Sequence, residues 1–233
     1  MSEAIPSFDI IRSERRKRLA IRVLEGKVQI LMPMRFSENV ARKFLEENRR
    51  WVQKKLQEYS NKTPYHARRY VDGESLLYLG KEYALNIAFS NISKTMIRDE
   101  QIFVFIRQTH CPQKRKKQIY EQLRFWYWQQ ANDILQQKTI SYAHILNVQH
   151  KSVSIRQFKS RWGSCSTKGD IQYNWQIIMA PEPVIDYLVI HELAHIKHHN
   201  HSPRFWSIVK SIMPNHKEHK HWLKINGHLL RIE

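Results

Sequence analysis

Residues 181–206 read PEPVIDYLVIHELAHIKHHNHSPRFW, and this stretch decides how the C-terminal part of the chain folds. Pro181 to Pro183 place prolines and an acid where a helix begins, because the first turn needs no donor from proline and favours negative charge. An apolar stripe at helical spacing follows, formed by Val184, Tyr187, Leu188, Leu193 and Ala194. The stretch therefore predicts a buried helix.

The same helix carries the pattern HExxH, with His191, Glu192 and His195. Residues four apart stand on one face of a helix, so both imidazoles can reach one metal ion at ~2.0–2.1 Å. Glu192 then faces the metal's water rather than the coordination sphere. The alternative is two surface histidines on a histidine-rich helix. We favour the metal site because the pattern lies in a helical context.

A catalytic zinc usually has three protein ligands and one position for water. His201 is the favoured third ligand, because Asn200 can end the helix and Ser202 and Pro203 can start the next one, which turns the chain back. His198 and His199 would continue the same helix and are less suitable. Three later histidines remain alternatives: His216, His219 and His221.

Three neutral imidazoles leave the metal its full charge, which lowers the pKa of bound water towards ~7. Glu192 would accept that water's proton and pass it to the leaving group. We expect one zinc ion on grounds of availability, although nickel or cobalt also accepts three imidazoles.

The rest of the chain alternates between short strands and helices, which predicts an α+β fold. Two domains are expected: an N-terminal α+β region over residues 1–112 and a second domain over 113–233 that contains the metal site. The expected elements are a hairpin over 19–32, a helix over 37–59, a small antiparallel sheet over 71–106, a helix over 113–137, strands over 148–157 and 170–179, and helices to the end.

The chain has 233 residues and a formal charge of +18, spread as +6 over each of residues 1–60, 61–150 and 151–233. An even excess suits a surface that attracts polyanions such as DNA, and equally one that only keeps the protein dispersed. It gives no sign of a separate basic tail. Charge alone therefore leaves a nucleic-acid partner open.

No apolar run approaches the ~20 residues of a membrane span, and the N-terminal residues lack the apolar region of a secretory signal. Two cysteines, Cys111 and Cys165, are fewer than a disulfide framework uses. We expect a cytoplasmic protein with reduced thiols and no membrane contact; its oligomeric state is not indicated.

Residues 161–206 (RWGSCSTKGDIQYNWQIIMAPEPVIDYLVIHELAHIKHHNHSPRFW) closely resemble the YgjP-like metal-dependent hydrolases, a zincin family related to SprT-like and Spartan-type proteases. Weaker likeness extends to residues 15–23 and 78–80. The resemblance implies metal ligands at His191, His195 and His201, with Glu192 as catalytic acid and base. It also implies a zincin-like helical core and a peptide or unfolded protein as substrate.

Several other residues have two interpretations. The strand over 170–179 could pair with an extended peptide or serve only the fold. Cys165 could be a nucleophile or a thiolate that blocks the metal, but we favour a buried small residue. Trp126 and Trp128 could stack on bases, although packing is favoured for Trp126.

We therefore expect a zinc metallopeptidase that uses Glu192 as general base. One alternative is a nucleic-acid-binding protein with a structural metal site. Structural zinc prefers four protein ligands, often cysteines, which disfavours this alternative. The other is a protease that acts on DNA-bound proteins, an idea that rests on analogy and on the charge.

Overall fold

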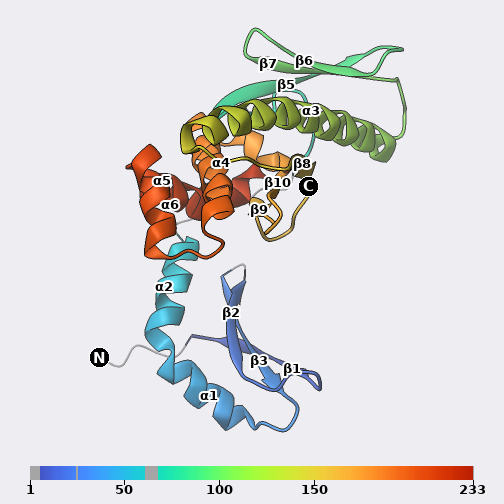
Figure 1. The fold of residues 1–233 in the computed structure, drawn as a ribbon. Coiled ribbons are helices and arrows are strands. Elements are labelled where there is room, and N and C mark those ends of the chain that lie inside the picture. Colours follow the sequence, from blue (N-terminus) through green and yellow to red (C-terminus); the bar gives the residue numbers. More distant parts are fainter. Residues whose placement is uncertain (1–5, 25, 61–67, 233) are drawn as a thin grey trace. The chain divides into compact units, whose positions relative to one another are not determined.

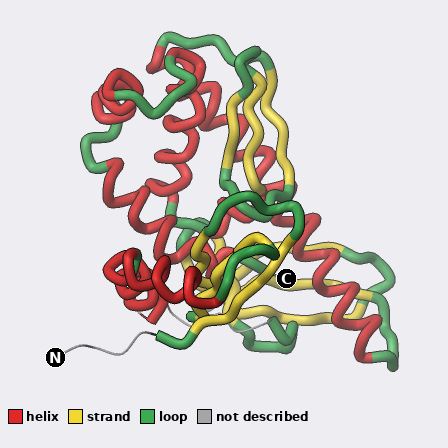
Figure 2. Tube along the Cα trace, turned by 90° about the horizontal axis from the view of Figure 1, so that it is seen from below, coloured by secondary structure: helices red, strands yellow, loops and turns green. Residues whose placement is uncertain are grey.

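The computed structural model describes residues 6–24, 26–60 and 68–232 and has an α+β fold, which confirms the predicted class (Figure 1). Figure 2 shows the strands gathered into short, separate sheets that are joined by helices and loops. None of the helices in these ranges is both long and apolar enough to cross a bilayer. The elements are β1 (Phe8–Ser13), β2 (Ala20–Leu24), β3 (Lys27–Pro33), α1 (Glu38–Glu47), α2 (Arg49–Ser60), β4 (Ser75–Tyr78), β5 (Lys81–Phe89), β6 (Lys94–Arg98), β7 (Gln101–Ile106), α3 (Pro112–Leu146), β8 (Ser152–Arg156), β9 (Gly163–Cys165), β10 (Asp170–Asn174), the 3₁₀ helix η1 (Trp175–Met179), α4 (Glu182–Lys197), α5 (Pro203–Ile212), α6 (His216–Asn226) and the 3₁₀ helix η2 (Gly227–Leu230).

The chain divides into two compact units, residues 1–64 and 65–233, each with its own cluster of buried side chains. The expected domain boundary after residue 112 falls inside the second unit and stays a prediction. Strands β4 to β7 precede that boundary, yet Leu76 and Ile102 belong to the same buried cluster as Leu123 of α3.

The first unit contains a three-stranded sheet with β3 at its centre. β2 and β3 pair in antiparallel register and confirm the predicted hairpin, while β1 pairs with β3 in parallel. The predicted single helix over 37–59 is wrong in one respect: it is broken at Asn48, whose side chain donates to the Phe44 carbonyl at 2.8 Å. Buried residues of β3 and of the two helices form the core of this unit.

The first sheet of the second unit has the order β4-β5-β7-β6. The sequence predicted an antiparallel sheet, but β5 and β7 are parallel, so the sheet is mixed. The turn between β4 and β5 lies against the start of α4, because a methyl group at Gly80 would come within 2.7 Å of the Pro181 Cα. Gly80 has a φ of +77°, which favours glycine. This close approach fixes where α4 begins.

Helix α3 is 35 residues long and continues well past the predicted end at residue 137. Its C-terminal half remains helical because Thr139, Ala143 and Leu146 extend the buried stripe. The helix packs against β7 on one side and against α4 and η1 on another. It therefore links the strand layer to the helix that carries HExxH.

The third sheet has the order β8-β10-β9 and lies next to α4. The predicted strand over 170–179 ends at Asn174, whose side-chain oxygen accepts from the Gln176 backbone N–H at 3.2 Å. Residues 175–179 form the 3₁₀ helix η1, and all five side chains are buried, so the exposed face expected of a half-buried strand is absent. Between the two expected strands, residues 163–165 form the short strand β9.

Candidate metal centre

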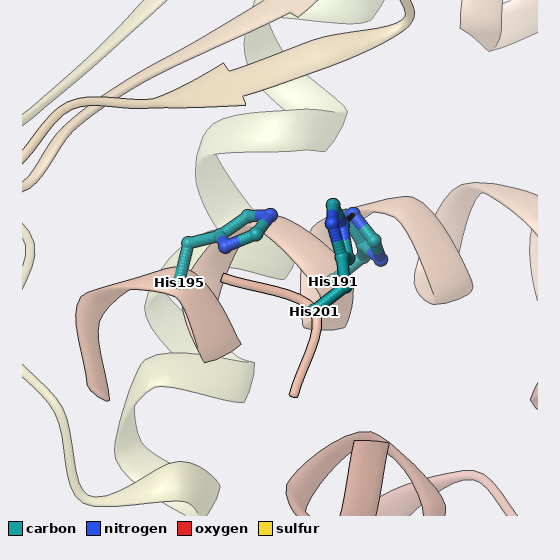
Figure 3. A group of neighbouring side chains, drawn as sticks. All are labelled: His191, His195 and His201. Atoms are coloured by element: carbon teal, nitrogen blue, oxygen red, sulfur yellow. Dashed lines mark hydrogen bonds between the residues drawn. The ribbon is translucent and has the colours of Figure 1, made fainter. Parts of the chain in front are cut away.

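Three histidines converge at the end of α4, and among the residues that the structure describes they form the one histidine, cysteine and carboxylate group with metal-ligand spacing. His191 and His195 lie one turn apart on α4, and His201 comes from the loop before α5 (Figure 3). One nitrogen from each ring lies within 4.8 Å of the others. Nε2 of His191 and Nε2 of His201 are 3.1 Å apart, close to the separation of two ligands that share an ion at ~2.0–2.1 Å.

The chain reverses at His201 because α4 ends earlier than expected. Its last helical residue is Lys197, and His198 has extended backbone angles. The His198 carbonyl lies 3.1 Å from Nδ1 of His195, which helps to orient that ring. Ser202 then caps α5 by accepting from the Phe205 backbone N–H at 3.4 Å.

Aromatic rings hold the three imidazoles in place. Phe205 is fully buried and contacts all three, with ring centroids 4.6–5.0 Å apart. Trp206 stacks on His201, with ring centroids 5.6 Å apart, and also on His216, with ring centroids 5.5 Å apart. These stacked rings, His201, Trp206 and His216, are called the ring column below.

The alternative third ligands lie outside the cluster. His216 is buried in the ring column, and its Nδ1 lies 3.1 Å from the Met213 carbonyl. His198, His199, His219 and His221 are also absent from the one group with ligand spacing in the described part of the chain. The geometry thus brings together the three histidines that the sequence favoured.

Burial favours the neutral form of His191 and His195, and the neutral imidazole is the form that binds metals. Burial lowers the pKa of His191 to about 3, and the charges of His195, His201 and Lys220 lower it further. Burial also lowers the pKa of His195. Three imidazole nitrogen donors without a thiolate suit zinc or a similar divalent ion, so the residues present fit the metal that the sequence implied.

Glu192 is buried beside this cluster, with 4% of its surface exposed. Burial raises the pKa of its carboxyl to about 8, against the opposing charge of Arg161. Strand β9 covers it: a methyl group at Gly163 would lie 2.5 Å from Oε1 of Glu192. The carboxyl group therefore occupies the space that a side chain at Gly163 would fill.

A cavity of about 340 Å³ opens next to His191 and Glu192. One wall comes from α4, another from α6, and the start of β9 closes it. Its lining residues are Trp162, Gly163, Tyr187, Leu188, His191, Glu192, Lys220, Leu223 and Lys224. This space is large enough for part of a substrate, because ligand pockets usually hold about 300–1,000 Å³.

The surroundings of Cys165 and Trp126 show whether these two residues have a chemical role or a packing role. Burial raises the pKa of the Cys165 thiol to about 11, so the thiol stays protonated at neutral pH, and Cys165 is outside the metal-ligand group of the described residues. Trp126 is buried and packs on Tyr78 and Tyr127, whereas Trp128 is exposed. The predicted packing role of Trp126 agrees with this geometry, whereas Cys165 is half-buried rather than buried as expected.

The strand that could have paired with a peptide has no free edge in its sheet. β10 (Asp170–Asn174) lies at the centre of its sheet, with β8 along one edge and β9 along the other. Both of its edges are therefore occupied. β9 is an outer strand of this sheet. It could not be predicted from the sequence because it is three residues long and has small side chains.

Comparison with known proteins adds a family to this geometry. The family described as YgjP-like, metallopeptidase domain, matches residues 17–226. Among curated proteins no relative matches. Two solved structures are similar over part of the chain. The abylysin metallopeptidase zymogen of Pyrococcus abyssi is 29% identical, with 40% of this chain and 95% of that chain covered and a TM-score of 0.36. The jannalysin metallopeptidase zymogen of Methanocaldococcus jannaschii is 22% identical, with 41% and 96% covered and a TM-score of 0.36.

Proposed function

This chain belongs to the YgjP-like family of metallopeptidase domains, and on that premise we propose that it hydrolyses peptide bonds with a zinc ion held by His191, His195 and His201. One observation carries the proposal: three imidazoles converge beside a buried carboxyl group at the edge of a cavity. Three protein ligands without cysteine favour a catalytic metal over a structural one.

Glu192 is the proposed general base. When bound, a divalent cation supplies positive charge that polarises a carbonyl group, makes water more acidic and favours the ionised form of Glu192. The Glu192 carboxylate accepts the proton of the attacking water and then donates it to the leaving nitrogen. Its burial excludes competing water, and the backbone of Gly163 limits where the carboxylate can lie.

Strand β9 is the proposed edge for an extended substrate. It pairs with β10 along one edge, and no strand of the described residues pairs with its other edge. Gly163, its first residue, lines the cavity beside His191 and Glu192. A peptide that adds to this edge would gain main-chain hydrogen bonds largely independent of its sequence, which suits unfolded proteins as substrates.

The test of the general base is the Glu192→Gln variant, assayed with zinc on an unfolded protein. We expect about one metal ion per chain in both proteins, with hydrolysis at least ~100-fold slower in the variant, since a positioned base contributes about that much or more. Glu182→Gln is the matched control, because Glu182 lies in the first turn of α4 and pairs with Lys138. Wild-type hydrolysis by Glu192→Gln would refute the role of Glu192.

The charge of +18 favours a second candidate function, cleavage of proteins that are bound to DNA. Hydrolysis of a basic, DNA-binding substrate should then rise when DNA is added, and the stimulation should disappear at high salt because phosphate contacts are screened. Equal rates with and without DNA would leave the peptidase proposal intact and remove this one.

A further inference from the structure

The cavity beside the metal centre has a positive wall. Lys220 and Lys224 lie one turn apart on α6 and line the cavity opposite His191 and Glu192 of α4. Glu192 is the one carboxyl group among the lining residues that the structure describes. With Glu192 assigned to the attacking water, Lys220 and Lys224 are the remaining acidic or basic residues among the described residues that line the cavity, apart from the proposed metal ligand His191.

Lys220 has no acidic partner in the part of the chain that the structure describes. None of the ion pairs among the described residues includes it, although ten such pairs occur elsewhere. Its Nζ lies 4.4 Å from the centre of the Trp206 ring, an attractive contact that holds the ammonium group near the metal centre. Its charge reaches the site, because it contributes to the lowered pKa of His191.

The remaining lining suits the carbon chain of a substrate residue. Trp162, Tyr187, Leu188 and Leu223 provide aromatic and aliphatic surface in the same cavity. A side chain with a few methylene groups and a terminal carboxylate would match both parts, because its stem packs on these residues while its end reaches the lysines. A side chain with an ammonium end would be repelled.

From this arrangement we propose that the cavity is a specificity pocket for a substrate carboxylate, with Lys220 as its main determinant and Lys224 beside it. The inference rests on the proposed peptidase function. The carboxylate can come from an acidic side chain near the scissile bond or from the free C-terminus of a peptide. Both sources present the same chemistry to α6.

The first experiment compares substrates on zinc-loaded wild-type protein. Three peptides with blocked ends differ at one position next to the scissile bond, which carries Glu, Gln or Lys. We expect kcat/KM to be roughly three- to fivefold higher for Glu than for Gln, as an exposed ion pair allows, and lower still for Lys. The preference should shrink in high salt. A Gln peptide with a free or an amidated C-terminus tests the second source.

The second experiment changes the charge of Lys220, which lines the cavity. Lys220→Glu should reverse the order, so that the Lys peptide becomes the better substrate, while Lys220→Arg should keep the preference for Glu. Lys217→Glu is the matched control, because Lys217 lies on the same helix, is exposed and does not line this cavity. Metal content is measured in each variant, so that a change in zinc loading is separated from a change in selectivity.

The possible outcomes distinguish a failure of the carboxylate pocket from a failure of the proposed peptidase function. If the zinc-loaded protein cleaves no peptide, the proposed function fails and the pocket with it. If the Glu, Gln and Lys peptides are cleaved at equal kcat/KM, the peptidase proposal stands and the carboxylate pocket is refuted. An unchanged preference in Lys220→Glu also refutes it. A reversed preference in Lys220→Glu but not in Lys217→Glu supports it.

Discussion

Gly163 lacks a side chain at the point where β9 crosses the general base, and we expect the reaction to depend on this. In Gly163→Ala the new methyl group would meet Oε1 of Glu192 at 2.5 Å, so the carboxyl group must move. Displacement by about an ångström can cost on the order of 100-fold in rate. Steady-state kinetics should show kcat reduced roughly 10- to 100-fold with the metal content unchanged.

Ser164→Ala is the control for Gly163→Ala, because it alters the next residue of β9 without adding atoms. Its kcat should stay within about twofold of wild type. If Gly163→Ala retains wild-type kcat, Glu192 has room that the structure does not show, and its placement by β9 would be contradicted.

The carboxyl group of Glu192 also predicts how the stability of the metal-free protein depends on pH. Burial raises its folded pKa from 4.5 to about 8, so between these values the folded state binds a proton that the unfolded state has released. The contribution of Glu192 is therefore complete below about pH 4.5 and is lost as the pH rises through 8.

Chemical denaturation of metal-free wild-type protein and of Glu192→Gln at pH 6 and pH 9 measures this effect. The neutral amide does not titrate, so the stability of the variant relative to wild type should increase with pH. Comparing the two proteins at each pH cancels the titration of His191 and the other groups they share. A difference that is the same at both pH values would show that Glu192 titrates normally in the fold.

The residues of the metal centre could largely be predicted from the sequence because their placement is local. The helical period brings His191 and His195 to one face of α4. The chain then reverses after the end of α4, which returns His201 to the same place. Gly163 and Lys220 could not be predicted as neighbours of Glu192, because their approach depends on how a separate sheet and a later helix pack on α4. Their part in catalysis stays a proposal.

Among the elements, β9 can be tested directly, since its outer edge is the proposed binding site for the substrate backbone. Methylation of one backbone nitrogen of the peptide, a residue or two from the scissile bond, removes a donor without changing the side chains. KM should rise roughly two- to tenfold at positions that pair with β9, as expected for one lost hydrogen bond.

Methylation at alternate positions provides the control, because successive N–H groups of an extended chain point in opposite directions. A series in which KM rises at every second position supports pairing with a strand edge. No change at any position along the series would mean that the peptide backbone does not pair with β9.

The elements differ from the sequence-based expectations where distant contacts decide them. β5 pairs in parallel with β7, a pairing between strands that are not consecutive in the chain, and a local hairpin pattern cannot predict it. Helix α3 is longer than expected because Thr139 and Ala143 are buried. Residues 175–179 are buried on all sides, which removes the alternation that predicted a strand. The helices with strong local signals, α4 and α5, were predicted, although α4 ends at Lys197 rather than near Asn200.

For the whole molecule, the two separate cores predict which fragments fold. Residues 65–233 contain one complete buried cluster and should unfold cooperatively and bind zinc when expressed alone. Residues 113–233 lack Leu76, Leu85 and Ile102, so α3 would expose apolar surface, and burying each such side chain is worth about 1.5–3 kcal/mol. That shorter fragment should be insoluble or lack a cooperative transition.

Circular dichroism melts and zinc content of the two fragments check this prediction. A shorter fragment that melts cooperatively and binds zinc as well as the longer one would support the boundary expected from the sequence after residue 112. The opposite result would place β4 to β7 in the folding unit of the metal centre.

The ring column also allows metal binding to be followed by tryptophan fluorescence. Trp206 stacks on His201, and Lys220 lies over its ring, so any change of charge or position at His201 alters the electric field around one indole. Its fluorescence should therefore shift when zinc binds, and the difference between wild type and Trp206→Phe isolates this signal from the other six tryptophans. The chain thus carries its own optical reporter of metal occupancy, usable without any substrate.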